Sequence, residues 1–263
     1  MRVATFNILH GRSPADDRVD IDRFVASLCA LEADVLALQE VDRNQPRSEG
    51  VDLTAIAAEE LGLPEHRFVA ALSGNPGAMW LAADGEEQPD SAAYGIAILS
   101  RYPVHSWEVV RLAPVPVKVP MRFTGSKGAT WVRDEPRVAL AATIDSPCGE
   151  LTVANTHLTF VPWWSPHQLR TLRRSLPATD RLLLTGDLNM GSARAERLSR
   201  MRSLVGVATF PADRPTQQLD HVLAGRGFDL RVIAGRSHRL PVSDHRALSI
   251  DLAREAEGPT PFS

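Results

Sequence analysis

A carboxylate and an amide follow an apolar run in LLLTGDLNMG, residues 182–191. The run has the character of a buried strand, and Gly186 marks the point where regular structure ends. Asp187 and Asn189 lie two positions apart, so in an extended segment their side chains point the same way and can converge on one ligand. Their oxygen atoms suit a hard cation such as Mg²⁺, or a phosphate placed beside one. A strand that ends in an ordinary polar turn would explain the same residues.

Polar side chains recur at the ends of the other apolar segments. They are Asn7, Glu40, Asn155, His157, Asp187, Asn189, Asp220, Asp244 and His245. Open α/β architectures assemble their sites from strand ends at one edge of a sheet. A shared site therefore explains this recurrence better than a series of unrelated polar turns.

The segments that must position these residues have the periodicities of strands and helices. Strands are predicted at residues 2–9, 34–41, 67–72, 94–100, 137–145, 151–158, 181–189, 219–225, 230–235 and 245–253. Helices are predicted at residues 21–33, 54–61, 165–176 and 192–204. Gly62 is a suitable residue to end the second helix. Ser165, Pro166 and Gln168 indicate a capping box with proline at the first helical position of the third.

Several predicted strands are apolar on both faces, so helices must cover one side and a second sheet the other. The expected architecture is a layered α/β sandwich. A chain of 263 residues suits one domain. We place that domain at residues 1–254 and expect a disordered tail at 255–263. Two long stretches, 73–91 and 112–135, fit neither the helical nor the strand periodicity, and loops of this length are usually functional or mobile.

Composition narrows the class of protein. With 44% hydrophobic and 23% charged residues, the chain is typical of a soluble globular protein and not of a disordered or fibrous one. No apolar run approaches the roughly 20 residues of a transmembrane segment. The N-terminus turns polar too early for a secretory signal, so we expect a cytoplasmic protein, with secretion after removal of a signal as the alternative. Cys29 and Cys148 fit no thiolate metal site, and we expect both to be buried.

Charge argues weakly against a nucleic-acid partner. The formal net charge is −3, so the chain lacks the overall basic field that often accompanies nucleic-acid binding. A local basic rim would still hold phosphate. Arginines at helical spacing offer such rims, although an ordinary solvated helix face is the simpler interpretation. They are Arg170, Arg173 and Arg174, and separately Arg194, Arg197 and Arg200.

A series of short segments spans nearly the whole chain. In order they are TFNI, LQEVD, YGIAILS, EPR, NTHL, GDLN, LDHVL and SDH, between Asn7 and His245. The ordered set resembles the endonuclease/exonuclease/phosphatase superfamily of metal-dependent phosphoesterases, which includes deoxyribonucleases, sphingomyelinases and inositol polyphosphate 5-phosphatases. This resemblance implies a four-layer α/β/β/α sandwich with two packed, mostly antiparallel mixed sheets. It also implies hydrolysis of a phosphoester by in-line attack of an activated water.

The resemblance implies a metal site. Glu40 corresponds to the main carboxylate ligand of Mg²⁺, with Mn²⁺ as an alternative, and Asn7 and Asp244 assist it directly or through water. A phosphoester is anionic and resists attack, so catalysis needs positive charge on its oxygens and an aligned nucleophile. A divalent cation supplies that charge without needing a full protein cage.

The resemblance also implies catalytic roles. Asp187 and Asn189 would position the water and the phosphate oxygens. His245 would contact the scissile phosphate, with Asp220 orienting its ring, and His157 would be a second histidine facing the phosphate. A histidine oriented by a carboxylate can stay cationic near neutral pH. Either Asp187 or a histidine could accept the proton from water.

The substrate is the least determined feature. His157 in NTHL distinguishes the chain from abasic-site endonucleases, which carry a tyrosine-containing segment there. Arg137 and Asn155 are expected to contact the substrate. Trp163 and Trp164 could pack under their loop, stack on a base or sugar, or enter a lipid interface. A small or lipid-linked phosphoester is preferred. A deoxyribonuclease-like enzyme acting on DNA or RNA is the alternative, and a catalytically silent binding module on the same fold is the second.

Overall fold

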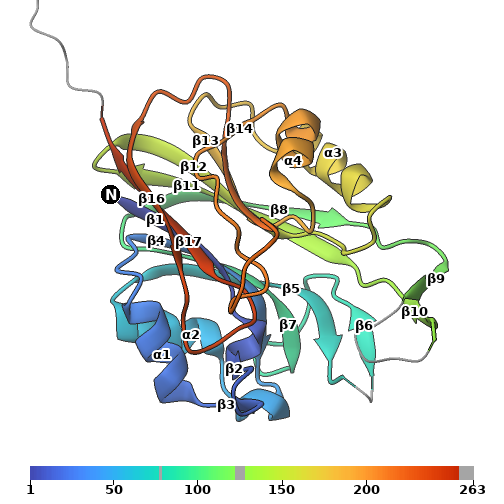
Figure 1. Cartoon of the computed structure of the whole chain (residues 1–263). Helices are drawn as coiled ribbons and strands as arrows, with labels where there is room; N and C mark the ends of the chain where they lie inside the picture. Colours follow the sequence, from blue (N-terminus) through green and yellow to red (C-terminus); the bar gives the residue numbers. More distant parts are fainter. Residues whose placement is uncertain (77–78, 122–127, 255–263) are drawn as a thin grey trace, which may run out of the picture.

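The computed structural model describes residues 1–76, 79–121 and 128–254, so the tail expected at 255–263 lies outside the described residues. Two large sheets pack face to face, and helices cover both outer faces (Figure 1). The layers follow the order helix, sheet, sheet, helix. The expected four-layer sandwich is therefore confirmed.

Seven strands of the described chain form the first sheet, in the order β16-β17-β1-β4-β7-β5-β6. Only the β1–β4 pair among them is parallel. Their bounds are β1 Arg2–Asn7, β4 Val35–Arg43, β5 Glu65–Gly74, β6 Trp80–Ala82, β7 Ala93–Ser100, β16 Arg231–His238 and β17 Ala247–Ala253.

Six described strands form the second sheet, in the order β14-β15-β13-β12-β11-β8, with β12 and β13 as its parallel pair. Their bounds are β8 Val104–Leu112, β11 Arg137–Ser146, β12 Gly149–His157, β13 Leu182–Asp187, β14 Arg202–Ser203 and β15 Asp220–Ala224. Two small ribbons pair β2 Arg12–Ser13 with β3 Arg18–Val19, and β9 Lys118–Met121 with β10 Thr130–Arg133.

The helices are α1 Ile21–Cys29, α2 Leu53–Leu61, α3 Ser165–Ser175 and α4 Ser192–Ser199. Asp20 and Asp52 cap α1 and α2, because their carboxylates accept hydrogen bonds from the first backbone amides. As expected, α2 ends at Gly62, which is left-handed with φ 61°. No helix among the described residues is long and apolar enough to cross a membrane.

Apolar side chains on both faces of the strands build separate cores. In β12, Val153 faces the space between the sheets, whereas Ala154 faces α3 and α4. In β4, Val35 lies in the core between the sheets and Leu36 packs against α1 and α2. This alternation explains why the strands read as apolar throughout.

Several local expectations were wrong. Strand β8 was not predicted, because it is an edge strand that is largely exposed and has little apolar alternation. Strands β6, β9 and β10 lie within the two stretches expected to lack a period. Helix α4 stops at Ser199 because Arg200 is left-handed, with φ 57°. Cys29 is exposed, whereas Cys148 is buried as expected.

The capping box at α3 does not form. Trp164 occupies the N-cap position and makes no side-chain cap hydrogen bond. The Gln168 side chain instead accepts a hydrogen bond from the Thr159 amide at 2.9 Å and donates one to the Ala113 carbonyl at 2.9 Å. Gln168 therefore anchors two loops that follow strands of the second sheet.

Candidate active site

Strand direction brings the expected site residues to one edge of both sheets. The parallel pairs β1–β4 and β12–β13 carry site residues near their C-terminal ends, and the antiparallel neighbours β11, β15 and β17 begin at that edge. The residues placed there are Asn7, Glu40, Arg137, His157, Asp187, Asp220 and His245. The site therefore lies where the two sheets meet.

Unusual backbone geometry aims two of the carboxylates. Gly186 has φ 125°, and a Cβ at this position would overlap the carbonyl oxygen of Thr156. Only glycine lets β13 approach β12 so closely just before Asp187. Glu40 has φ 56° at a bulge in the pairing of β4 with β7. Bulges redirect side chains, and this one sits beside the site.

These residues surround a cavity of about 210 Å³. Its walls combine carboxylates, histidines, an arginine, an amide and two aromatic rings. The lining residues are Glu40, Tyr94, Glu135, Arg137, His157, Phe160, Asp187, Asn189 and His245. Asn7 and Asp220 are buried behind this wall and hold its members in place.

Asn7 connects the two sheets at the site. Its Nδ2 donates to Glu40 Oε1 at 3.0 Å and to Asp187 Oδ2 at 3.2 Å. Its Oδ1 accepts from the Leu9 amide at 3.1 Å, which fixes the orientation of the amide group. Asn7 thus presents its NH₂ group, and not its oxygen, to the two carboxylates.

The surroundings of His245 favour its cationic form. Its Nδ1 lies 2.9 Å from Asp220 Oδ2, and its Nε2 lies 3.8 Å from Asp187 Oδ2. Burial alone would lower the pKa of His245. The charge and hydrogen bond of Asp220, with the charges of Asp187 and Asp244, instead raise this pKa to about 10.

The surroundings of His157 favour its neutral form. Burial, followed by the charges of Arg137 and His245, lowers its pKa well below the ordinary value. Arg137 Nη1 lies 3.3 Å from His157 Nδ1, and a guanidinium has no acceptor, so Nδ1 must accept. The proton of the neutral ring then sits on Nε2, which lies 3.6 Å from Asp187 Oδ2.

Burial disfavours the ionised forms of Asp187 and Glu40. Burial, with a contribution from the charge of Asp220, raises the pKa of Asp187 to about 7, although His245, the Asn189 amide and Asn7 oppose the shift. Burial also raises the pKa of Glu40. The Asn7 hydrogen bond and the His245 charge oppose that shift, whereas the Asp244 charge adds to it.

The chemistry of the donor set fits a hard divalent cation. Within the described chain, Glu40 accepts one hydrogen bond, at Oε1, and the Asp244 side chain accepts none. These neighbouring carboxylates therefore lack compensation that a cation would supply. Ligand atoms of Asp187, Asp220 and His245 also lie within 4.8 Å of one another. Asp220 and His245 already form a hydrogen bond with each other, between Oδ2 and Nδ1.

Asn189 lines the cavity in a left-handed conformation, with φ 50°. Its backbone amide donates to Asp187 Oδ1 at 2.9 Å, and its Nδ2 donates to the Leu158 carbonyl at 2.9 Å. These bonds leave the side-chain oxygen of Asn189 without a partner in the described part of the chain. Asp244, next to His245, is half-buried.

Asn155 lies outside the cavity. Its side chain is fully buried between the sheets, where Nδ2 donates to the carbonyls of Leu38 at 2.8 Å and Ala97 at 2.9 Å. Its Oδ1 accepts from Gln39 Nε2 at 2.7 Å. The expected substrate contact is therefore corrected to a structural role, because every polar atom of this side chain joins one sheet to the other.

The two tryptophans also lie outside the cavity lining. Trp164 donates from Nε1 to the Ala113 carbonyl at 2.9 Å, and its ring lies 4.5 Å from that of His167. Trp164 thus packs under its loop. Trp163 is 57% exposed and meets Trp164 edge to face. The loop packing expected as one alternative holds for Trp164, whereas Trp163 presents its ring to solvent.

Three lining residues were not predicted as site residues. They are Tyr94, Glu135 and Phe160. Glu135 stands in the EPR segment, 3.4 Å from Arg137, and Phe160 follows His157 by three residues. Proximity to identified site residues was the available signal for both. Tyr94 begins a buried strand, so the sequence gives no reason to separate it from a packed core aromatic.

Comparison with solved structures shows the same fold in proteins of low sequence identity. An endonuclease/exonuclease/phosphatase from Beutenbergia cavernae aligns with a TM-score of 0.67 and 24% identity, over 96% of this chain and 71% of that one. A mannosyl-6-phosphatase from Bacteroides thetaiotaomicron gives 0.63 and 14%, over 96% and 99% of the two chains. Sphingomyelinase C from Streptomyces griseocarneus gives 0.61 and 16%, over 95% and 98%.

Sequence comparison identifies the family. A search of curated protein sequences finds no significant match. The profile of the Endonuclease/Exonuclease/phosphatase family matches residues 4–245, nearly the whole chain. That range contains every residue of the cavity wall. The chain therefore belongs to the Endonuclease/Exonuclease/phosphatase family of phosphoester hydrolases.

Proposed function

We propose that the protein is a Mg²⁺-dependent phosphoesterase that hydrolyses a small or lipid-linked phosphoester. The observation that carries this proposal is the position of His245, which Asp220 holds within 3.8 Å of Asp187 in the wall of one cavity, where its pKa is raised to about 10. A cation is useful there because negative charge accumulates on the phosphate oxygens in the transition state. The family itself depends on a metal, and the acidic lining of the cavity suits one.

Glu40 and Asp244 are the residues we assign to the metal. When bound, Mg²⁺ would act as a Lewis acid on the phosphate oxygens. Asn7 has a different task from the one expected, because its NH₂ group already bridges Glu40 and Asp187. It keeps two carboxylates from different sheets at a fixed separation.

The remaining residues divide the work on the phosphate. Asp187, whose pKa of about 7 keeps it poised between its charge states, is positioned to accept a proton from the attacking water. His245 donates from Nε2 to the phosphate or to the leaving oxygen. His157 is neutral and donates from Nε2, so it orients a phosphate oxygen without adding charge. Asn189 and Arg137 complete the wall around the phosphate.

The surroundings of the cavity support a substrate with an apolar part. Strand β10 leads directly into Glu135 and Arg137 of the wall, and Trp80 of β6 lies 3.5 Å from Glu135. Exposed apolar side chains lie on or next to β6, β9 and β10 and on the loop after β12. They are Met79, Leu81, Val117, Trp131 and Trp163. Grouped apolar side chains on a surface usually mark a contact with a partner or a lipid.

A panel of phosphoesters would test the proposal. Purified protein would be assayed with phosphomonoesters, sphingomyelin or phosphatidylinositol phosphates in vesicles, and supercoiled plasmid, each with Mg²⁺ and with chelator. Asp187→Ala removes the proton acceptor, and Asp145→Ala is the matched control because Asp145 is exposed at the far end of β11. Turnover that needs Mg²⁺, falls at least 100-fold in Asp187→Ala and persists in Asp145→Ala supports the proposal.

Other outcomes favour the alternatives. Plasmid nicking that exceeds lipid or monoester turnover, and that disappears in Asp187→Ala, would replace the preferred substrate with nucleic acid. Metal binding without turnover of any phosphoester would instead indicate a binding module on the same fold.

A further inference from the structure

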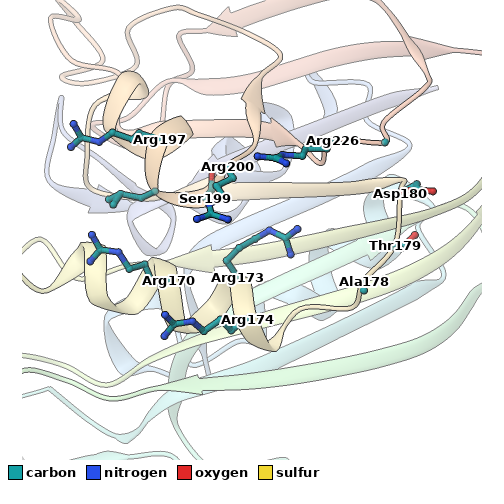
Figure 2. Close-up of a pocket in the computed structure, with 12 residues that line it drawn as sticks. Arg170, Arg173, Arg174, Ala178, Thr179, Asp180, Arg197, Ser199, Arg200 and Arg226 are labelled. Carbon is teal, nitrogen blue, oxygen red and sulfur yellow. The ribbon is translucent and has the colours of Figure 1, made fainter.

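A second cavity lies on the outer face of the second sheet, between α3, α4 and the turn after β15 (Figure 2). Its volume is about 950 Å³. It borders the start of β13, whereas the cavity of the candidate active site borders the end of that strand. Strand β13 runs from Leu182 to Asp187, so roughly 16 Å separates the two ends. No residue lines both cavities among those described.

Arginines dominate the lining of this second cavity, which we call the arginine groove. They are Arg170, Arg173 and Arg174 of α3, Arg197 and Arg200 at the end of α4, and Arg226 in the turn after β15. Figure 2 shows Arg173, Arg200 and Arg226 reaching into the space between the two helices. The chain as a whole has a net charge of −3, so this concentration of positive charge is local.

The arginines of the groove lack counterions within the protein. No carboxylate of the described chain lies within ion-pair distance of any of them, whereas Arg2, Arg23, Arg101 and Arg181 elsewhere are paired. Asp180 is the acidic residue among the described lining residues. It sits at one end of the groove, with its carboxylate turned away from the arginines (Figure 2).

Helix dipoles explain part of this arrangement. Arg173 and Arg174 lie in the last turn of α3, and Arg197 lies in the last turn of α4. Each helix end carries only about half a negative charge. Arg226 is on neither helix, yet it extends over the same space (Figure 2). Two helix ends therefore leave most of the positive charge of the groove uncompensated.

We infer that the arginine groove binds a soluble oligophosphate, meaning a small molecule that carries several phosphate groups. Guanidinium groups bind phosphate oxygens with two parallel hydrogen bonds, and arginines from three elements can hold several phosphates at once. The volume is within the range of small-molecule sites, about 300–1,000 Å³.

The lining disfavours two other polyanions. It contains no aromatic side chain among its described residues, so it offers no stacking surface for the bases of a single strand. It also contains none of the exposed large apolar residues that would enter a membrane. Arg173, Arg200 and Arg226 project into the space between the helices (Figure 2), and such a concave surface encloses a compact ligand better than a flat lipid surface does.

Direct binding would test the inference without catalysis. Isothermal titration calorimetry would use metal-free full-length protein in chelator at 0.15 M salt, with inositol hexakisphosphate and inorganic tripolyphosphate as probes. The test variant is Arg173→Ala/Arg200→Ala/Arg226→Ala. The matched control is Arg67→Ala/Arg194→Ala/Arg231→Ala, which removes the same charge from exposed arginines outside the groove that have no ion-pair partner in the described chain. Thermal unfolding would check that both variants remain folded.

We expect at least one probe to bind with micromolar affinity. The groove variant should lose about 100-fold in affinity, because arginine–phosphate hydrogen bonds are among the strong ones. The control should stay within about threefold. Equal losses in both variants, or no binding tighter than 1 mM, would overturn the inference. Duplex oligonucleotides or phosphatidylserine vesicles that bind through these arginines more tightly than both probes would also overturn it.

Discussion

The Nδ1 atom of His245 lies 2.9 Å from Oδ2 of Asp220, and both side chains are buried. Asp220 begins β15 of the second sheet, whereas His245 lies just before β17 of the first sheet, and β16 separates the two residues along the chain. Their hydrogen bond thus joins the two sheets at the site and keeps a cationic imidazole beside Asp187.

Asp220→Asn should lower kcat by about 100-fold or more, since general acid–base groups contribute about 10² to 10⁴-fold. The amide keeps the shape of the carboxylate but removes the charge that holds the proton on His245. KM should change much less than kcat. Steady-state kinetics of Asp220→Asn beside Asp145→Asn would measure this, and a kcat within threefold of wild type would remove Asp220 from the mechanism.

The stability of the metal-free protein should fall between about pH 6.5 and pH 10. His245 has a raised pKa in the folded state, so its stabilising charge is fully present below the unfolded pKa and is lost as the pH rises through about 10. The pKa of Asp187 is also raised in the folded state, so its contribution to stability likewise falls between about pH 4 and pH 7. One proton gives a slope of at most about 1.4 kcal/mol per pH unit.

Urea unfolding in chelator at several pH values would measure that slope. Asp220→Asn should flatten it, because the pKa values of both His245 and Asp187 depend on the Asp220 charge. His105→Gln, at an exposed position on β8, is the control and should keep the wild-type slope. A slope that is the same in all three proteins would contradict the assigned charge of His245.

Gly186→Ala should destabilise the protein by roughly 3 kcal/mol or more, and it should impair activity in whatever fraction still folds. The new Cβ would overlap the Thr156 carbonyl, and the backbone has φ 125°. Gly191→Ala is the matched control, because its Cβ would meet open space and its φ is −68°. Chemical denaturation compares them, and similar losses of stability would argue against the close approach of β12 and β13.

Asn7→Ala should lower the stability of the metal-free protein by about 2–4 kcal/mol, since it removes hydrogen bonds to two buried carboxylates. Added Mg²⁺ should recover part of the loss, because a cation offsets the repulsion between Glu40 and Asp187. Thermal unfolding with and without Mg²⁺ would show this recovery. Asn75→Ala, at an exposed position, is the control and should lose little stability in either condition. If Mg²⁺ recovers none of the stability that Asn7→Ala loses, Asn7 does not support the metal site.

Trp163→Ala should weaken turnover of a substrate held in vesicles by about tenfold, while it leaves turnover of a water-soluble phosphoester within twofold. Trp163 is exposed on the loop that follows β12 and does not line the cavity. Ile233→Ala removes an equally exposed apolar side chain from β16 and is the control. Equal rates for both substrates in both variants would remove the support for a lipid-linked substrate.

The sequence predicts the edge of the site well, because alternation and strand direction follow from local patterns. His157 and Asp187 close buried parallel strands, so their convergence follows from the register alone. The sequence does not reveal how far inside the core a polar side chain on that face lies. Asn155 lies two residues before His157 and shares its face, yet it lies one step further into the core, where backbone carbonyls of the other sheet take its amide.

Features that depend on tertiary packing were beyond the sequence. Gln168 matched a capping box, but two loop backbone groups compete successfully for its side chain. Strand β8 has too few buried positions to show a period, and it is fixed by pairing with β11. Arg173 and Arg200 read as solvated helix faces, and only the packing of α3 beside α4 brings them to one groove.

The dependence of phosphoester hydrolysis on Mg²⁺, compared between wild type and Glu40→Gln, tests whether Glu40 holds a metal that the reaction needs. The rate would be measured in metal-stripped protein over a range of Mg²⁺ concentrations, with a substrate that wild type turns over. We predict no turnover without metal, recovery with Mg²⁺, and a half-saturating Mg²⁺ concentration at least tenfold higher in Glu40→Gln, because one ligand charge is lost. Full activity in chelator would show that hydrolysis needs no metal, and identical Mg²⁺ curves for the two proteins would show that Glu40 does not hold it.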